Sequence, residues 1–189
     1  MAKLIGISGS LRRGSFNTAL LHAAAQAMPS GSELIVKTLH GIPLYDGDVE
    51  ATDGLPSAAM ALKEAVVASD GVLLVTPEYN NGIPGVFKNA IDWISRPPSD
   101  AKRVFGDKPF ALMGASPGNF GTTLSQAAWL PVLRTLGTRA WFGGRLVVPH
   151  AASVFDANGA LKDATIHEHL RQFMLGFVDF VARSGPRTS

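Results

Sequence analysis

The segment that decides the fold reads Pro77-Glu-Tyr-Asn-Asn-Gly-Ile-Pro-Gly-Val-Phe-Lys-Asn-Ala-Ile-Asp-Trp93. It follows the short apolar run Val72–Val75 and leads into a stretch whose apolar residues have helical spacing. The prolines and glycines between these two parts predict a conformationally restricted loop. The segment therefore predicts a buried strand, a polar loop and a helix. In open parallel sheets, loops at the carboxyl ends of strands bind ligands, so this Glu, Tyr and Asn-rich loop is a candidate ligand platform.

The same strand–loop–helix order recurs along the chain. Strands are predicted at Lys3–Ser8, Glu33–Thr38, Gly71–Thr76, Pro109–Ala115 and Ala140–Val148. Helices are predicted at 15–28, 57–69, 85–95, from the residues after Gly121 to about 136, and from Thr165 to beyond Val181. Five strands alternating with five helices predict one α/β domain over residues 1–189, with helices on both faces of a parallel sheet. The tail from Ser184 is expected to be disordered.

The connections carry weaker signals. His40–Pro56 is rich in Pro, Gly and Asp and is predicted to be mostly loop, and Arg96–Asp107 is predicted to be a surface connection. Pro131 lies inside a predicted helix, so a kink or an early break is expected there. Thr165 and Glu168 have the spacing of a capping box at the start of the last helix.

Composition narrows the possible chemistry. A chain of 189 residues with 46% hydrophobic and 17% charged residues suits a covered sheet. The net charge of +2, without a dense basic run, argues against a nucleic-acid partner. The absence of cysteine excludes disulfides, Cys nucleophiles, iron–sulfur clusters and thiolate zinc sites. Any redox chemistry must therefore use a bound organic cofactor, or a metal held by nitrogen and oxygen ligands.

The sequence predicts no segment that would insert into a membrane. The longest apolar runs fall short of the roughly 20 residues that a spanning helix needs. The apolar run near the N-terminus is too short for a signal peptide and is interpreted as the first strand. We therefore expect a cytoplasmic protein.

The first loop, Gly9–Thr18, also lies between a predicted strand and a predicted helix. Its Gly9-x4-Gly14 spacing is that of a P-loop, but Ser15 stands where that motif requires Lys, and the dinucleotide pattern G-x-G-x-x-G is absent. What remains is a polar loop at a helix N-terminus, where free N–H groups and the helix dipole favour an anion. The loop predicts either a metal-free site for one terminal phosphate or an ordinary polar turn.

The order of the strands brings three loops together. In a sheet of order 2-1-3-4-5, the loops after strands one and three meet at the switch point, where FMN sits in flavodoxin-like folds. The loop after strand four, Ser116–Thr122, would add a third wall. A mononucleotide with a flat ring matches a phosphate pocket at one end and a Tyr/Asn platform at the other.

Two motifs carry a family resemblance. Gly9-Ser-Leu-Arg12 with Ser15-x-Asn17, followed by Pro77-Glu-Tyr-Asn80 and Pro84-Gly-x-x-Lys-Asn-Ala-Ile-Asp-Trp93, resembles the NADPH-dependent FMN reductase family, and within it the bacterial chromate and quinone reductases. The resemblance covers residues 3 to about 180. It implies a flavodoxin-like three-layer sandwich, tightly but non-covalently bound FMN, NADPH or NADH as co-substrate, and a homodimer or homotetramer.

The resemblance also implies which residues hold the cofactor. By this resemblance, the ribityl phosphate would be held by Ser10, Arg12, Ser15, Asn17 and Thr18. The isoalloxazine edge would be lined by Pro77, Glu78, Tyr79, Asn80 and Asn81. The third side of the cofactor site would be closed by Ser116 and Gly118. Two positions depart from the family pattern: Thr122, where many relatives have a second Gly, and Pro131.

The implied reaction places the chemistry on the cofactor. NAD(P)H would give hydride to N5 of FMN, and an acceptor would then take the electrons in the same place, in a ping-pong cycle. No catalytic side chain and no metal ligand are assigned. The implied acceptors are quinones, with chromate, other metal oxyanions, azo dyes or free flavin as further possibilities.

Two alternatives come from other functional classes. One is a flavodoxin-type electron carrier that does not itself oxidise NAD(P)H, and the other is a flavin-binding regulatory module. Carriers of this type tend to be strongly acidic, whereas this chain carries a net charge of +2. Steady-state oxidation of NADPH without a partner protein would separate an enzyme from both alternatives.

Overall fold

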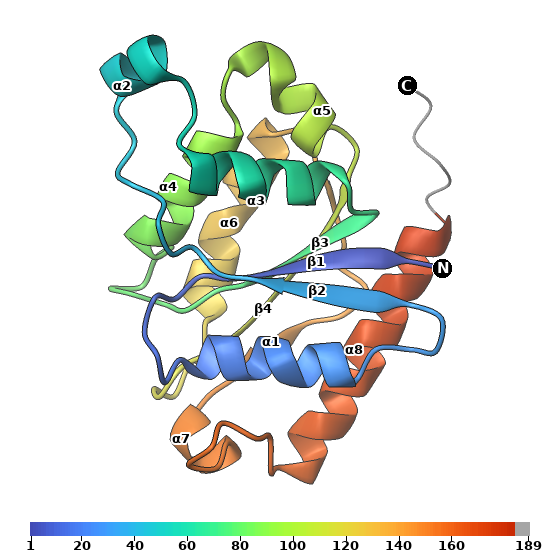
Figure 1. Cartoon of the computed structure of the whole chain (residues 1–189). Helices are drawn as coiled ribbons and strands as arrows, with labels where there is room; N and C mark the ends of the chain where they lie inside the picture. The colour runs from blue at the N-terminus through green and yellow to red at the C-terminus, as the bar shows by residue number, and fades with distance from the viewer. Residues whose placement is uncertain (184–189) are drawn as a thin grey trace.

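A computed structural model, which describes residues 1–183, shows a parallel sheet covered by helices on both faces (Figure 1). The strands are β1 (Lys3–Ser8), β2 (Glu33–Lys37), β3 (Gly71–Val75), β4 (Pro109–Ala115), β5 (Arg139–Ala140) and β6 (Leu146–Val148). The strand order is β2-β1-β3-β4-β5, with β6 also beside β4, and these strands all pair in parallel. The fold is flavodoxin-like, as predicted, and the tail from Ser184 lies outside the described residues.

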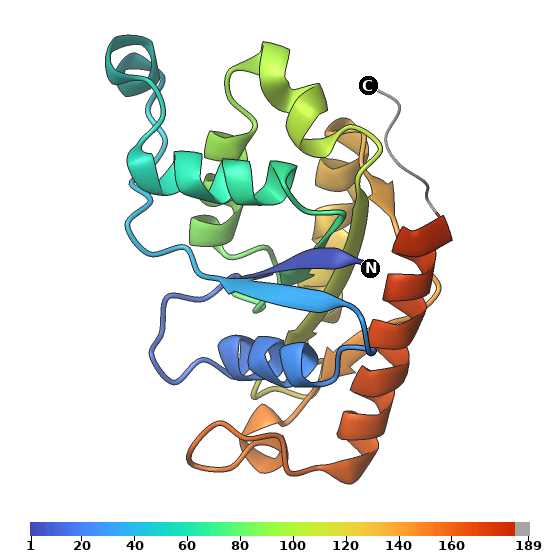
Figure 2. The same cartoon turned by 45° about the vertical axis from the view of Figure 1, so that its right-hand side comes forward.

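The helices form two layers. They are α1 (Phe16–Gln26), α2 (Gly47–Asp53), α3 (Ser57–Val67), α4 (Gly85–Ile94), α5 (Ala101–Phe105), α6 (Thr123–Thr135), α7 (Ala151–Val154) and α8 (Ala164–Arg183), with a 3-10 turn at Pro98–Asp100. In both views α1 and α8 lie on one face of the sheet, and α3 and α4 lie on the other (Figures 1 and 2). Each face has its own apolar core, because successive strand residues point to opposite sides: Leu73 belongs to one core and Leu74 to the other.

The predicted fifth strand is interrupted, so the expectation of one strand at Ala140–Val148 was wrong. The chain pairs with β4 at Arg139–Ala140, leaves the sheet edge, and returns at Leu146. The cause is Trp141, whose ring packs on α8, 5.0 Å from Phe173 between centroids. Gly143 permits this path, because a Cβ there would come within 2.5 Å of the Trp141 indole nitrogen. The edge strand is therefore split where one partly buried indole ring packs on α8.

Two predicted connections contain helices. α2 lies inside the segment predicted to be mostly loop, and it begins where the Asp46 carboxylate accepts a hydrogen bond from the N–H of Asp48 at 2.9 Å. α5 lies inside the predicted surface connection at 96–107, and its residues Val104 and Phe105 are fully buried in one of the two cores. Burial of these two side chains explains why the segment is ordered rather than a plain surface loop.

The structure shows no early break of α6 at Pro131, and a different residue caps α8 from the one predicted. α6 continues past Pro131 to Thr135, and since Ala127 and Pro131 are both exposed, water can reach the carbonyl that the proline leaves unpaired. At the start of α8, the Asp163 carboxylate, rather than the Thr165 hydroxyl, accepts from a first-turn N–H, that of Ile166, at 2.9 Å. Glu168 does not reach back to complete a capping box, because it pairs with Arg171 at 2.7 Å.

Candidate functional site

A polar cavity of about 200 Å³ opens at the carboxyl edge of the sheet, where the loops after β1, β3 and β4 meet. We call it the switch-point cavity. Eight of the predicted site residues line it: Ser10, Arg12, Ser15, Asn17, Pro77, Glu78, Tyr79 and Ser116. Four predicted residues lie outside its lining, namely Thr18, Asn80, Asn81 and Gly118, whereas Phe16, Ala115 and Pro117 line it without having been predicted.

Close packing of two loops forms the floor of this region. The N–H of Gly9 donates to the carbonyl of Val75 at 2.9 Å, which ties the end of β1 to the end of β3. A Cβ at Gly9 would lie 2.1 Å from the Phe87 ring and 2.9 Å from Pro77. Because only glycine leaves room at this position, the first loop can rest directly on the loop after β3 and on α4.

The N-terminus of α1 supplies an anion-binding end. Ser15 is the N-cap, and its hydroxyl accepts a hydrogen bond from the N–H of Thr18 at 3.3 Å. The preceding N–H groups of the first turn, those of Phe16 and Asn17, have no acceptor within the helix. Together with the helix dipole, these two groups favour a bound anion such as phosphate.

Arg12 adds a positive charge at the same end. Its guanidinium donates to the carbonyl of Gly14 at 2.6 Å and lies over the Phe16 ring, 5.5 Å from the centroid. In the part of the chain that the structure describes, Arg12 forms no ion pair with a carboxylate. The guanidinium can therefore form charge-assisted hydrogen bonds with an anionic ligand.

Asn17 and Thr18 position this helix. The buried Asn17 carboxamide donates to the carbonyl of Ala115 at 2.8 Å and accepts from the Ala115 N–H at 2.9 Å, so it joins α1 to the end of β4. The Thr18 hydroxyl is 2.7 Å from that of Ser8 on β1. Both side chains thus hydrogen-bond within the protein and help to fix the position of the helix terminus.

The loop after β3 is a tight hairpin. Tyr79 and Gly82 exchange two backbone hydrogen bonds of 3.2 and 3.0 Å, and Asn80 and Asn81 between them have φ values of 49° and 62°. Two successive left-handed residues form the turn that suits a two-residue hairpin, and asparagine tolerates this conformation well. The exposed asparagines therefore shape the loop, while Tyr79, 50% exposed, lines the cavity.

Glu78 connects this hairpin to the third wall. One of its carboxylate oxygens accepts hydrogen bonds from the N–H groups of Leu124 and Ser125, at 2.8 and 2.9 Å, in the first turn of α6. These donors have no acceptor within the helix, and a negative charge is favourable beside a helix N-terminus. The side chain of Glu78 thus caps α6 and fixes the distance between two loops of the cavity.

The loop after β4 is closed by internal hydrogen bonds. The Ser116 hydroxyl donates to the carbonyl of Gly121 at 2.5 Å. Thr122 is fully buried, and its hydroxyl accepts from the Gln126 carboxamide at 3.0 Å. A Cβ at Gly114 would come within 2.3 Å of the Thr122 hydroxyl, so the glycine on β4 makes the room that the threonine occupies.

Comparison with known proteins identifies the family. The family model of NADPH-dependent FMN reductases matches residues 2–153. The chain belongs to this family. It is 42% identical to an NAD(P)H-dependent FMN reductase of Pseudomonas aeruginosa over 90% of both chains, and 38% identical to a 2-hydroxy-1,4-benzoquinone reductase of a Burkholderia species over 91% of this chain and 92% of that one.

A solved structure agrees with both the fold and the family. FerB, a flavoenzyme NAD(P)H:(acceptor) oxidoreductase of Paracoccus denitrificans, superimposes with a TM-score of 0.87 at 31% identity, over 98% of this chain and all of that one. This member of the FMN reductase family is an NAD(P)H-dependent oxidoreductase that uses FMN. No helix within residues 1–183 is long and apolar enough to cross a membrane.

The switch-point cavity of this FMN reductase fits one end of the cofactor. The N–H groups at the start of α1 and the Arg12 guanidinium suit a phosphate, and the half-exposed Tyr79 adds a flat aromatic surface to the lining. The cavity, at about 200 Å³, is smaller than the roughly 300–1,000 Å³ typical of pockets that enclose a ligand. Part of a bound ring system would therefore remain outside, where substrates can reach it.

Two ion pairs outside the cavity lower the pKa values of their carboxylates. A hydrogen bond from Arg96, at 2.8 Å, holds the pKa of Glu50 below its usual range. A pair of hydrogen bonds from Arg171 lowers the pKa of Glu168 to about 2. Within residues 1–183, no cluster of three or more His, Asp or Glu side chains could hold a metal ion.

Three lining residues were missed, each for a structural reason. Phe16 is an apolar residue of the predicted helix at 15–28; its ring packs against the core beside Phe155 and also lies under the Arg12 guanidinium in the cavity lining. Ala115 and Pro117 flank Ser116, and no polar group in their side chains drew attention to them. For Phe16, its place at the first position of a helix that follows a phosphate-type loop was an available signal.

Proposed function

We propose that this FMN reductase acts as an NAD(P)H:quinone oxidoreductase with a ping-pong cycle. The observation that supports it is the meeting of eight predicted cofactor residues in one cavity whose small volume would leave part of the cofactor ring accessible. When bound, FMN would accept hydride at N5 and return the electrons to an acceptor. NAD(P)H and the quinone would use the same open side in turn, because the loops after β3 and β4 enclose the other sides.

We assign the residues as follows. Arg12 and the first-turn N–H groups of α1 would hold the phosphate, with Ser10 and Ser15 beside them. Tyr79 and the Asn80–Asn81 turn would line the ring, and Glu78 would hold that turn against α6. No side chain is assigned as a general acid or base. The similarity to a 2-hydroxy-1,4-benzoquinone reductase supports quinones as acceptors. We propose chromate, other metal oxyanions, azo dyes and free flavin as further acceptors.

We also propose a homodimer or homotetramer in the cytoplasm. Four large apolar side chains are exposed along the connection and helices that precede β3: Leu44, Tyr45, Val49 and Met60. Tyr45 is held in place because its N–H donates to Asn89 at 2.8 Å and its hydroxyl donates to Glu50 at 2.8 Å. A pre-ordered apolar surface of this kind is suited to a subunit contact. Size-exclusion chromatography with light scattering measures the mass directly.

Initial-rate kinetics test the proposed cycle. NADPH oxidation would be measured at several fixed concentrations of a benzoquinone, without any partner protein. Parallel double-reciprocal plots are expected, because NADP⁺ leaves before the quinone binds. Intersecting plots would show that both substrates bind together and would contradict the ping-pong cycle. Bleaching of the flavin absorbance by anaerobic NADPH, with its return on adding quinone, checks the two half-reactions separately.

Arg12→Gln tests the proposed phosphate end. We expect the Kd for FMN to rise about tenfold or more, because a charge-assisted hydrogen bond contributes roughly 1.5–3 kcal/mol. The matched control is Arg13→Gln, which makes the same charge change at an exposed neighbour that does not line the cavity. An equal loss of affinity in both variants would mean that only the overall charge matters, and would contradict the assignment of Arg12.

A further inference from the structure

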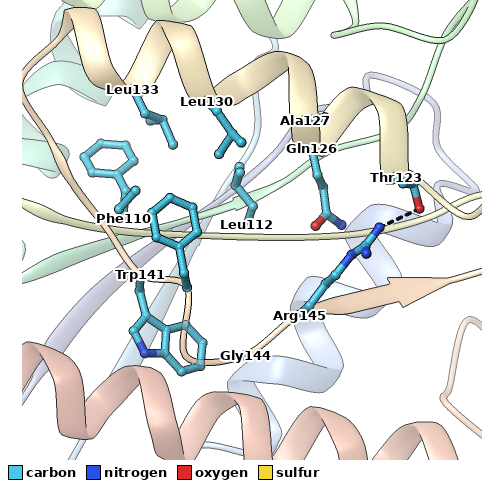
Figure 3. A pocket seen from close by; sticks show the side chains of 12 residues that line it. Phe110, Leu112, Thr123, Gln126, Ala127, Leu130, Leu133, Trp141, Gly144 and Arg145 are labelled. Atoms are coloured by element: carbon cyan, nitrogen blue, oxygen red, sulfur yellow. Dashed lines mark hydrogen bonds between the residues drawn. The ribbon is translucent and has the colours of Figure 1, made fainter.

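A second cavity, of about 410 Å³, lies between α6 and the segment 141–145, over the edge of β4. Figure 3 shows Leu130 and Leu133 of α6 on one side and Trp141 on the other, with Leu112 of β4 between them. We call it the edge cavity. It has no lining residue in common with the switch-point cavity. Its volume falls in the range of about 300–1,000 Å³ that is typical of small-molecule sites.

The interruption of the edge strand creates this cavity. β5 ends at Ala140 and β6 begins at Leu146, so the middle of β4 has no neighbouring strand on this side. The intervening chain turns away so that Trp141 packs against α8, with its ring centroid 5.0 Å from that of Phe173 and 5.6 Å from that of Phe177. The hollow is therefore held open by packing contacts on the far side of the segment.

The walls and the end of the edge cavity differ in chemistry. The walls are formed by aliphatic and aromatic side chains, whereas Thr123, Gln126 and Arg145 lie together at one end (Figure 3). The Arg145 guanidinium donates to the Thr123 hydroxyl at 2.9 Å. Arg145 is the one charged residue of the lining, and within residues 1–183 it has no carboxylate partner.

We propose that the edge cavity binds a small aromatic monocarboxylate. The ring would lie against Leu112 and Leu130, and the carboxylate would pair with the guanidinium of Arg145. A planar fork of N–H donors matches a carboxylate, and one charged residue balances one negative charge. An apolar pocket with a few convergent polar groups is the usual form of a small-molecule site. The proposal is independent of the proposed quinone reductase cycle, because it concerns binding at a separate place.

Isothermal titration of the FMN-saturated protein with 2-naphthoate tests this proposal. Saturation with FMN keeps the probe out of the switch-point cavity. We expect one saturable site with a Kd between about 10 µM and 1 mM, a range suited to a ligand of this size. The neutral analogue 2-naphthamide should bind at least about tenfold more weakly, because it cannot form the charged pair with Arg145.

Two variants locate the site. Arg145→Gln should weaken 2-naphthoate about tenfold and leave 2-naphthamide nearly unchanged, which a general loss of structure would not do. Ala127→Phe should abolish binding of both compounds, because residue 127 lines the cavity and is exposed, so a larger side chain can fill the space. The matched control is Arg134→Gln, on the same helix but outside the lining, which should bind as the unmodified protein does.

Three results would overturn the proposal. Absence of saturable binding up to about 5 mM is one, since this exceeds the expected range. Binding that both Arg145→Gln and Ala127→Phe leave unchanged would place the probe elsewhere, for instance on the exposed part of the flavin. The third result has two parts: the unmodified protein binds no probe, and Ala127→Phe changes the molecular mass of the assembly. Together they would show that a second copy of the chain covers this face. Because residue 145 is exposed, Arg145→Gln decides the question even if Ala127→Phe folds poorly.

Discussion

The two cavities differ in size, in chemistry and in how the chain builds them. The switch-point cavity is the smaller, about 200 Å³ against about 410 Å³, yet it gathers the predicted cofactor residues. Its polar groups come from three strand ends and one helix N-terminus, where backbone donors are unpaired. The edge cavity has apolar walls and a single charged residue. Unpaired backbone donors at strand ends, rather than a large volume, therefore distinguish the cavity that holds the predicted cofactor residues.

Their construction differs as well. The switch-point cavity depends on backbone conformation, as in the left-handed Asn80–Asn81 turn and the close contact at Gly9. The edge cavity depends on where side chains pack, above all on Trp141 against α8. Substitutions that alter the backbone should therefore damage flavin binding most, and side-chain changes at the edge cavity should leave it intact.

Gly9→Val is expected to have the largest effect. The added side chain meets Phe87 and Pro77 at distances that force one loop away from the other, and overpacking of this kind costs about 1–3 kcal/mol or more. Urea unfolding should show that loss, and FMN titration should show a Kd raised at least about 100-fold, because the phosphate loop moves as a unit. Gly14→Ala is the control in the same loop, since a Cβ there meets nothing within 4 Å. Similar losses in both variants would refute the packing argument.

Glu78→Ala should have the next largest effect. It removes the acceptor for two N–H groups of α6, and loss of such a cap costs about 1–2 kcal/mol. FMN affinity should fall severalfold, because the Asn80–Asn81 turn is no longer tied to α6. Glu78→Gln keeps an oxygen in place and should recover most of the stability in urea unfolding. An alanine variant with unchanged stability and FMN affinity would show that the two loops are held by other contacts.

Asn81→Ala tests the turn itself. A φ of 62° at residue 81 costs an ordinary side chain about 1–2 kcal/mol, whereas glycine adopts it freely. We expect a destabilisation of about 1 kcal/mol for Asn81→Ala and almost none for Asn81→Gly, measured by urea unfolding. If the glycine variant loses as much stability as the alanine variant, the asparagine side chain contributes contacts of its own.

Arg145→Gln should have the smallest effect on the redox site. The residue is exposed and lies outside the switch-point cavity, so its substitution should change stability by less than about 0.5 kcal/mol. The Kd for FMN should stay within about twofold, in contrast to Arg12→Gln. An equal loss of FMN affinity in Arg12→Gln and Arg145→Gln would contradict the conclusion that only the switch-point cavity binds FMN.

Most of the fold could be predicted from the sequence because its signals are local. β1 and β4 have the predicted bounds, and α4 begins at the predicted Gly85. The sheet order was confirmed as well, since alternation of apolar runs with helical periods leaves few arrangements. Predicted site residues that come soon after a strand, as Ser10 and Pro77 do, line one cavity. These inferences need only the polarity of a loop and its place after a strand.

Contacts between distant parts of the chain decided the rest. Asn17 bonds to Ala115, and Glu78 bonds to Leu124 and Ser125, so their positioning roles depend on partners 98, 46 and 47 residues away. The Asn80–Asn81 pair combines both kinds of information. Its left-handed turn depends on local sequence, whereas its exposure to solvent depends on how the rest of the chain packs. A sequence records which groups can hydrogen-bond, but only the packed structure selects their partners.

The amino-acid sequence was sufficient to predict the sheet, the order of its strands, the family and the loops that meet at the switch point. The break in the edge strand, the burial of α5 and the edge cavity follow from packing between distant parts of the chain. Packing of the Trp141 ring on α8 and full burial of Phe105 outweigh the local preference of the chain around them. That choice depends on surfaces that exist only once the helices have packed on the sheet.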